Sequence, residues 1–252
     1  MGGRGGASGF PANGPTPPMP PVVPAGPQSA SETTTLQELH DYMKTIGVRV
    51  DMSSLAGQTF ENVRKAAAGV EQIVKEFPQA AAIFNTLRGK DLGKGVLANA
   101  SIGGNITLAN YFFKKTEGEL DSRYQQTVKN GFHPAGTKTG DIATHEAGHV
   151  LERALIQKAF PGNDFSARLS QAAAWNNSTM ATKVIHEAVS NLKKTPAGKG
   201  KLTNDFINGV SRYATKNRSE TLAECVADYA ANGSGAKPLS VEVWKILKRE
   251  LG

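Results

Sequence analysis

Apolar residues recur at helical spacing over most of the chain. Two early segments each place them on a single helical face: Leu36, Leu39, Tyr42 and Met43 in residues 36–47, and Val63, Val70 and Ile73 in residues 60–77. Such spacing predicts amphipathic helices that pack one face against a core. The same pattern, with glycine and proline stops, predicts further helices at about 141–159, twice within 166–194, and at about 203–211, 219–231 and 240–250.

One segment has the pattern of strands instead. Residues 95–113 contain two short runs of β-favouring residues separated by Gly103, Gly104 and Asn105, which predicts a strand pair joined by a glycine-rich turn. The basic stretch that follows, ending in FHPAGTKTGD, predicts turns, with His133 as a turn residue or a substrate contact. The chain is therefore predicted to be α+β and mostly helical, with a small sheet ahead of the 141–159 helix.

The composition changes abruptly near residue 35. The first 31 residues hold eight of the 13 prolines and seven of the 27 glycines, so residues 1–34 are predicted to be a disordered leader. The chain has 252 residues, of which 39% are hydrophobic, and this is enough to bury one substantial core. Residues 35–252 are therefore predicted to form one domain.

Charge and cysteine content exclude several classes of protein. The net charge of +7 is spread along the chain without a basic stripe, so no nucleic-acid partner is expected. Cys225 is the single cysteine, which excludes an intrachain disulfide and a metal site of the Cys-x-x-Cys type. No apolar run has the length of a signal peptide or a membrane span, so we expect neither signal-directed export nor a membrane partner.

The predicted helix at 141–159 contains a candidate metal site in the sequence HEAGH. His145 and His149 lie one turn apart, so their imidazoles can reach one ion. Glu146 lies about 100° around the axis from His145, where it can reach a water on that ion and act as general base. Glycine inside a helix costs about 1 kcal/mol relative to alanine, so Gly148 predicts the close approach of another backbone.

A catalytic zinc needs a third protein ligand, and the predicted helix at 219–231 offers three carboxylates. Glu220, Glu224 and Asp228 recur every four residues and form one acidic stripe. The stripe is also compatible with a solvent-exposed face, and Glu220 with a capping box that has Asn217 as its N-cap. Helical spacing alone does not choose between Glu220 and Glu224.

The HEAGH motif is followed by the pattern Tyr-x6-Glu-x-x-Ala-Glu-x-x-Ala, which begins at Tyr213. Over residues 95–233, the two motifs resemble the catalytic domain of the anthrax-lethal-factor type of gluzincin metallopeptidase, in the form found in phage and prophage proteins. The resemblance implies a zincin-like fold that holds one Zn²⁺.

The resemblance also implies a role for each motif residue. It assigns the zinc ligands to His145, His149 and Glu220, the general base to Glu146, the phenol that stabilises the tetrahedral intermediate to Tyr213, and a carboxylate that holds a ligand in place to Glu224. The long interval between the second histidine and the third ligand predicts a helical insertion at about 163–212.

We therefore expect zinc-dependent hydrolysis of peptide bonds, in which Glu146 takes a proton from a zinc-bound water. The substrate is expected to be a protein or peptide that lies in extended form along the edge of the predicted sheet. A phage origin implies the bacterial cytoplasm or the phage particle, with particle components as further partners. Two alternatives stay open: a phage structural or accessory protein that uses the fold for interaction, and a chance HEAGH in a helical binding protein without metal.

Overall fold

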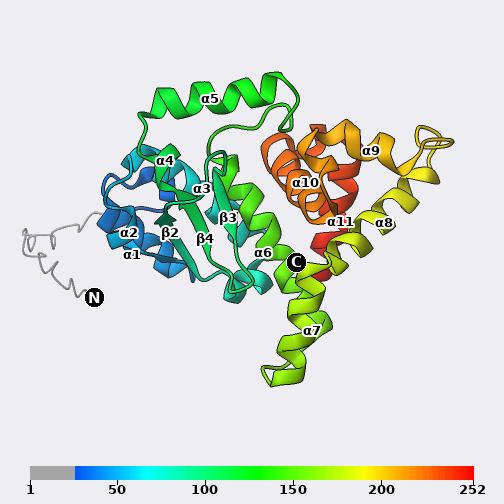
Figure 1. The fold of residues 1–252 in the computed structure, drawn as a ribbon, viewed down its shortest axis with the longest axis horizontal. Coiled ribbons are helices and arrows are strands. Elements are labelled where there is room, and N and C mark those ends of the chain that lie inside the picture. Colours follow the sequence, from blue (N-terminus) through cyan, green and yellow to red (C-terminus); the bar gives the residue numbers. More distant parts are fainter. Residues whose placement is uncertain (1–25) are drawn as a thin grey trace, which may run out of the picture.

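The computed structural model describes residues 26–252, so most of the predicted leader, residues 1–25, lies outside the described part. The described residues form an α+β fold that is mostly helical, as predicted (Figure 1). The longer helices are α1 Leu36–Thr45, α3 Phe60–Glu76, α5 Glu117–Lys129, α6 Asp141–Ala159, α7 Phe165–Asn176, α8 Thr179–Lys193, α9 Thr203–Val210, α10 Arg218–Asn232 and α11 Pro238–Leu251. Short helical segments are η1 Ala30–Glu32, α2 Met52–Leu55, η2 Pro78–Ile83, α4 Asn110–Phe113, η3 Tyr213–Thr215 and η4 Gly233–Gly235. Across residues 26–252, no helix is long and apolar enough to cross a membrane.

A small sheet lies in the first half of the chain. Its strands are β1 Arg49–Val50, β2 Thr86–Lys90, β3 Ala98–Ala100 and β4 Ile106–Ala109, in the order β1-β2-β4-β3. The predicted strand pair is confirmed, because β3 and β4 are antiparallel with Asn99 opposite Thr107. β2 pairs in parallel with β1 and β4. β3 is therefore an edge strand, and it packs against α6.

The helices predicted from apolar spacing are all present. α1, α3 and α6 correspond to the predicted helices at 36–47, 60–77 and 141–159, and α7 to α11 follow in the predicted order. α6 lies between the sheet with its helices on one side and α8 to α11 on the other, while α7 extends away from the body (Figure 1). The interval predicted as a helical insertion contains α7, α8 and α9.

Two predictions of local structure are wrong. The stretch predicted as turns contains α5, a helix of 13 residues whose N-terminus has a capping box between Thr116 and Glu119. Only Leu120 and Tyr124 of α5 are buried, so its apolar pattern is weak. The strands β1 and β2 were also missed, since β1 has two residues and β2 buries only Leu87.

The packed domain begins before residue 35. Ala30 is fully buried, and its N–H donates a hydrogen bond of 2.8 Å to Glu71 Oε2 in α3. Thr33 is also fully buried, and its carbonyl oxygen accepts a hydrogen bond from Arg64. The boundary predicted at residue 35 therefore lies too late, because specific contacts with α3 fix residues that a proline-rich composition had assigned to the leader.

The crossing of α6 and α10 confirms the reason expected for Gly148. A Cβ atom added at Gly148 would lie 2.8 Å from Ala223 Cα and 3.3 Å from Val226 Cβ. Real Cβ atoms essentially never approach another atom so closely, so only glycine permits this distance between the helices. The close crossing brings the first turn of α10 beside the HEAGH segment of α6.

Candidate metal centre

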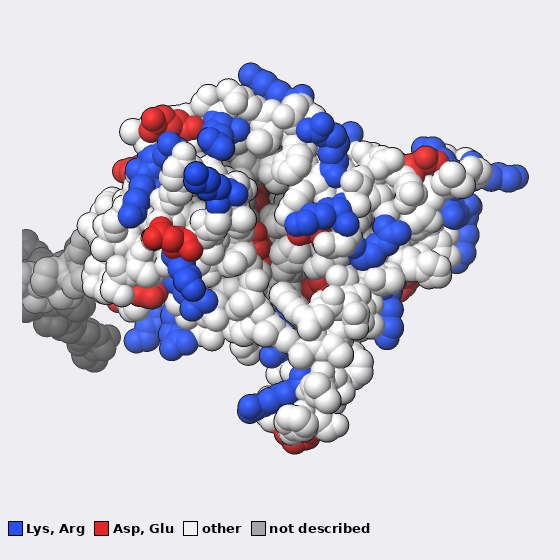
Figure 2. Space-filling view, in the orientation of Figure 1, with Lys and Arg blue, Asp and Glu red and all other residues white. Residues whose placement is uncertain are grey.

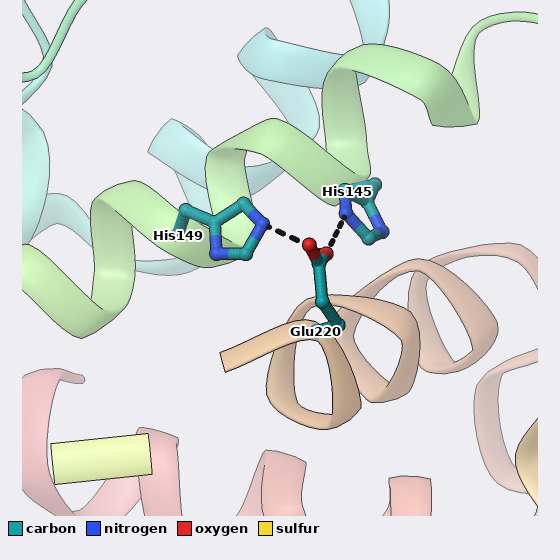
Figure 3. A group of neighbouring side chains, drawn as sticks. All are labelled: His145, His149 and Glu220. Atoms are coloured by element: carbon teal, nitrogen blue, oxygen red, sulfur yellow. Dashed lines mark hydrogen bonds and ion pairs between the residues drawn. The ribbon is translucent and has the colours of Figure 1, made fainter. Parts of the chain in front are cut away.

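Three side chains that can ligate a metal converge where α6 faces the first turn of α10. His145 and His149 project from successive turns of α6, and Glu220 projects from α10 (Figure 3). Glu220 Oε2 lies 3.1 Å from His145 Nε2 and 3.3 Å from His149 Nε2. Each of the three residues offers a ligand atom, and these atoms all lie within 4.8 Å of one another.

The spacing and chemistry of these atoms fit zinc. In a tetrahedral site with zinc bonds of about 2.0–2.1 Å, two ligand atoms are about 3.4 Å apart. The two Nε2 to Oε2 distances, 3.1 Å and 3.3 Å, are close to that separation. Two imidazoles and one carboxylate are also a donor set of catalytic zinc sites, in which a fourth position stays open. His145, His149 and Glu220 could therefore hold one zinc ion.

The three carboxylates of the α10 stripe have different surroundings. Glu220 faces the histidines, while its backbone N–H donates to the N-cap residue Asn217 at 2.9 Å. Asp228 instead accepts the backbone N–H of Lys237 at 2.8 Å. Glu224 and Asp228 are each 1% exposed, so the stripe is not a solvent-exposed face. Asn217 therefore caps the helix by accepting the backbone N–H of Glu220, while the Glu220 side chain approaches the histidines.

Glu224 supports His145 from the side opposite to the Glu220 contact. Its Oε1 lies 2.8 Å from His145 Nδ1, although the two groups are not aligned as a hydrogen bond. The same oxygen is 3.2 Å from His133 Nδ1, and Oε2 accepts the Ser211 hydroxyl at 2.7 Å. Burial opposes ionisation of Glu224, but the contacts with His133 and His145 outweigh it and lower its pKa to about 2. Glu224 is therefore an ionised carboxylate behind a candidate ligand.

His145, His149 and Glu220 form a cluster, and the carboxylates of Glu220 and Glu224 give it a strong affinity for positive charge. Burial lowers the pKa of His145, but Glu220 and Glu224 outweigh burial and raise that pKa to about 10. Burial likewise raises the pKa of Glu220, but His145 and His149 hold it well below its usual range. The same carboxylates would favour a bound metal cation in place of a proton on His145.

Glu146 lies beside the cluster without belonging to it. The side chain is on α6, is 7% exposed and lines a cavity together with His145. Burial raises the pKa of Glu146, while His145 and His149 oppose that rise. The backbone of Ala100 in β3 lies against the carboxylate. A buried carboxylate with a raised pKa is suited to accept and release a proton near neutral pH.

Tyr213 reaches the cluster from η3. Its hydroxyl donates to Glu220 Oε1 at 3.2 Å, and Lys216 Nζ lies 3.1 Å from both of these oxygens. Burial and then the Glu220 carboxylate raise the pKa of Tyr213, so its phenol stays protonated at neutral pH. Lys216 was not singled out from the sequence, although its position three residues after Tyr213 brings both side chains to the same carboxylate.

His149 has a separate set of partners. Its Nδ1 lies 2.9 Å from Ser219 Oγ, and the Ser219 hydroxyl donates to Glu152 Oε2 at 2.5 Å. The other Glu152 oxygen accepts the backbone N–H of Ala181 at 3.1 Å. Ser219 and Glu152 were also not singled out from the sequence. Glu152 follows His149 by three residues on α6, and this spacing is the one sequence signal that places it near the cluster.

A cavity of about 340 Å³ opens beside these residues. Its lining combines the segment that leads into β3, the end of α5 with the following loop, and the cluster itself: Lys94, Gly95, Val96, Leu97, Ala98, Tyr124, Phe132, His133, Ile142, His145, Glu146, Tyr213 and Lys216. In the space-filling view, acidic atoms lie inside the central groove, and basic side chains lie around it (Figure 2). His133 therefore belongs to the cavity wall as well as to the support of Glu224.

The six residues to which the resemblance assigns a role lie at this cavity or directly behind it. No protein-family model, curated protein or solved structure matches the chain. The roles assigned from the resemblance stay predictions.

Proposed function

We propose that this protein is a zinc-dependent endopeptidase of the gluzincin class, similar to the anthrax-lethal-factor type, with a zincin-like domain. The observation that carries the proposal is the convergence of three zinc-compatible ligand atoms with a buried carboxylate and a phenol. His145, His149 and Glu220 would hold the ion. When bound, zinc supplies Lewis acidity toward a peptide carbonyl and acidifies a water molecule.

Glu146 is the general base in this proposal. Its carboxylate accepts a proton from water as the water oxygen attacks the peptide carbonyl carbon. Glu146 then delivers that proton to the nitrogen of the leaving amine as the carbon–nitrogen bond breaks. The raised pKa of this buried carboxylate suits both steps, and its absence from the ligand group leaves both oxygens free of the metal.

Tyr213 is the proposed donor to the oxygen that becomes negative when the carbonyl is attacked. The phenol stays protonated because burial and Glu220 raise its pKa, so the hydroxyl can donate. Lys216 Nζ lies 3.1 Å from the phenol oxygen and adds positive charge at the same point. A donor of this kind contributes about 10²–10³ in turnover.

The substrate is proposed to be a polypeptide bound in extended form. β3 is an edge strand, and both Ala98 of β3 and Glu146 line the cavity. An exposed strand edge can pair with an extended peptide through backbone hydrogen bonds. The apolar walls formed by Leu97, Phe132 and Ile142 would accept an apolar side chain next to the scissile bond.

Hydrolysis of a mixed peptide library by the purified, zinc-supplemented protein tests this proposal. Glu146→Gln is expected to retain zinc and to lower turnover about 10²–10⁴-fold, since the residue moves protons and does not bind the metal. Tyr213→Phe is expected to retain zinc and to lose most activity. Glu187→Gln, a surface carboxylate paired with Arg249, is the matched control and should behave as the wild type.

The outcomes separate the two functional classes. Cleavage by the wild type with unchanged turnover in Glu146→Gln would refute the role of Glu146. A protein that binds zinc yet hydrolyses no peptide in the library would favour the interaction module of a phage particle over the enzyme.

A further inference from the structure

The second histidine of the cluster is held by a chain of groups that ends in the helical insertion. His149 Nδ1 contacts the Ser219 hydroxyl at 2.9 Å, and this hydroxyl donates to Glu152 Oε2 at 2.5 Å. Glu152 is 1% exposed. A carboxylate so buried needs partners for both oxygens, and the second oxygen accepts the Ala181 N–H from α8.

The hydrogen bonds of Ser219 favour one tautomer of His149. When Glu152 is ionised, the single proton of the Ser219 hydroxyl goes to its carboxylate, and the Ser219 oxygen accepts from His149 Nδ1–H. With its proton on Nδ1, the neutral ring leaves the Nε2 lone pair free. Nε2 is the atom that lies 3.3 Å from Glu220 Oε2. The hydrogen bonds from His149 through Ser219 to Glu152 therefore favour the tautomer that ligation through Nε2 requires.

The first turn of α8 lacks a cap of its own. Its N-cap residue, Ser178, has a left-handed backbone with φ of 50° and makes no side-chain capping hydrogen bond. Glu152 of α6 supplies an acceptor to the first turn of α8 instead, through the Ala181 N–H. The positive end of the α8 dipole also favours a carboxylate at this place. One carboxylate thus serves both the fold of the insertion and the orientation of His149.

We propose that Ser219 and Glu152 are positioning residues for the metal ligand His149, and that α8 of the insertion completes their support. This inference rests on the proposed zinc site. It makes the insertion part of the metal centre, because a displacement of α8 would release Glu152, and Ser219 would then lose the acceptor that fixes its hydroxyl.

The test is the dissociation constant for zinc, measured by competition with a chromophoric chelator. Ser219→Ala and Glu152→Gln are each expected to raise this constant about 10–100-fold, the usual effect of removing such support. Ser219→Thr keeps the hydroxyl and is expected to bind zinc close to the wild-type affinity. This rescue distinguishes a positioning role from a general effect on packing.

Two control variants remove buried polar groups elsewhere. Ser240→Ala changes a fully buried serine of α11, and Glu71→Gln changes a buried carboxylate that caps the N-terminal segment. Both should bind zinc as the wild type does, even where the unfolding temperature falls. Cooperative thermal unfolding, followed by circular dichroism, establishes that each variant is folded.

Each result decides the inference. Folded Ser219→Ala with wild-type zinc affinity would overturn it while leaving the proposed zinc enzyme intact. Failure of Ser219→Thr to restore the affinity lost in Ser219→Ala would also overturn it, since the hydroxyl would then not be the active group. Absence of zinc binding in the wild type itself would overturn the proposed function, and this inference with it.

Discussion

The two histidines of the cluster come from one helix but are supported in different ways. His145 has the Glu224 carboxylate 2.8 Å from its Nδ1. His149 instead contacts the neutral hydroxyl of Ser219, and the Glu152 carboxylate lies one group further away. Glu224 lies on α10, whereas Glu152 lies on α6 itself and contacts α8.

The carboxylate beside His145 mainly affects the charge of that ring, whereas the hydroxyl beside His149 mainly affects the orientation of its ring. A carboxylate in direct contact stabilises positive charge on the imidazole, and His145 accordingly has a pKa raised to about 10 by Glu220 and Glu224 against the effect of burial. A hydroxyl contributes mainly direction, because it has one proton to donate and lone pairs to accept. The two sides of the centre should therefore respond unequally when their supports are removed.

Glu220→Ala should have the largest effect, because both histidines contact Glu220. With two protein ligands in place of three, we expect the dissociation constant for zinc to rise by more than about 100-fold, beyond the usual loss for an outer partner. Metal titration of the folded variant measures the effect, with Glu187→Gln as control. A change below tenfold would remove Glu220 from the ligand set.

Glu224→Ala should weaken zinc binding less than Glu220→Ala but more than Ser219→Ala. The variant removes the carboxylate beside His145 and leaves the Ser211 hydroxyl without its acceptor. We expect a loss in the upper part of the range of about 10–100-fold. If Glu224→Ala released zinc more readily than Glu220→Ala, the third ligand would be Glu224, one helical turn further along α10.

Glu71→Gln should leave zinc binding unchanged and affect stability alone. Burial raises the pKa of Glu71, but Lys75, Tyr42 and the Ala30 N–H outweigh it and lower the pKa in the folded protein. Glu71 therefore stabilises the fold above the pKa of the unfolded chain, and this contribution is lost as the pH falls through the folded pKa. The variant should lose about 1–2 kcal/mol of unfolding free energy at neutral pH.

Chemical denaturation of the wild type and Glu71→Gln at several pH values checks this prediction. The difference between their free energies of unfolding should shrink below about pH 4, where the carboxyl group takes up its proton. A difference that stays constant or grows in acid would show that the ionised carboxylate is not the stabilising species.

The site was predicted most accurately from the sequence where the relative positions of its residues depend on a single helix. The spacing of His145 and His149 follows from the helical repeat, and Gly148 implied the close approach of another backbone, which is that of α10. The choice among Glu220, Glu224 and Asp228 depends on how α10 rotates against α6. That rotation is a property of tertiary packing, so equal spacing along one helix does not contain it.

Two of the contacts that escaped prediction join residues far apart in the sequence. His133 and Ser219 contact residues 91 and 70 positions away in the sequence, and no local pattern specifies such pairs. α5 was missed because its exposed surface leaves few apolar positions to count, and its capping box was the one local signal of its start. The composition also gives no sign that the backbone N–H of Ala30 donates a hydrogen bond to Glu71 of α3.

Elemental analysis of the wild-type protein, purified without chelator, tests the central claim most directly. The convergence of His145, His149 and Glu220 predicts one equivalent of zinc per folded chain. Zinc well below half an equivalent in a protein that still unfolds cooperatively would contradict the metal centre and the enzymatic function proposed from it.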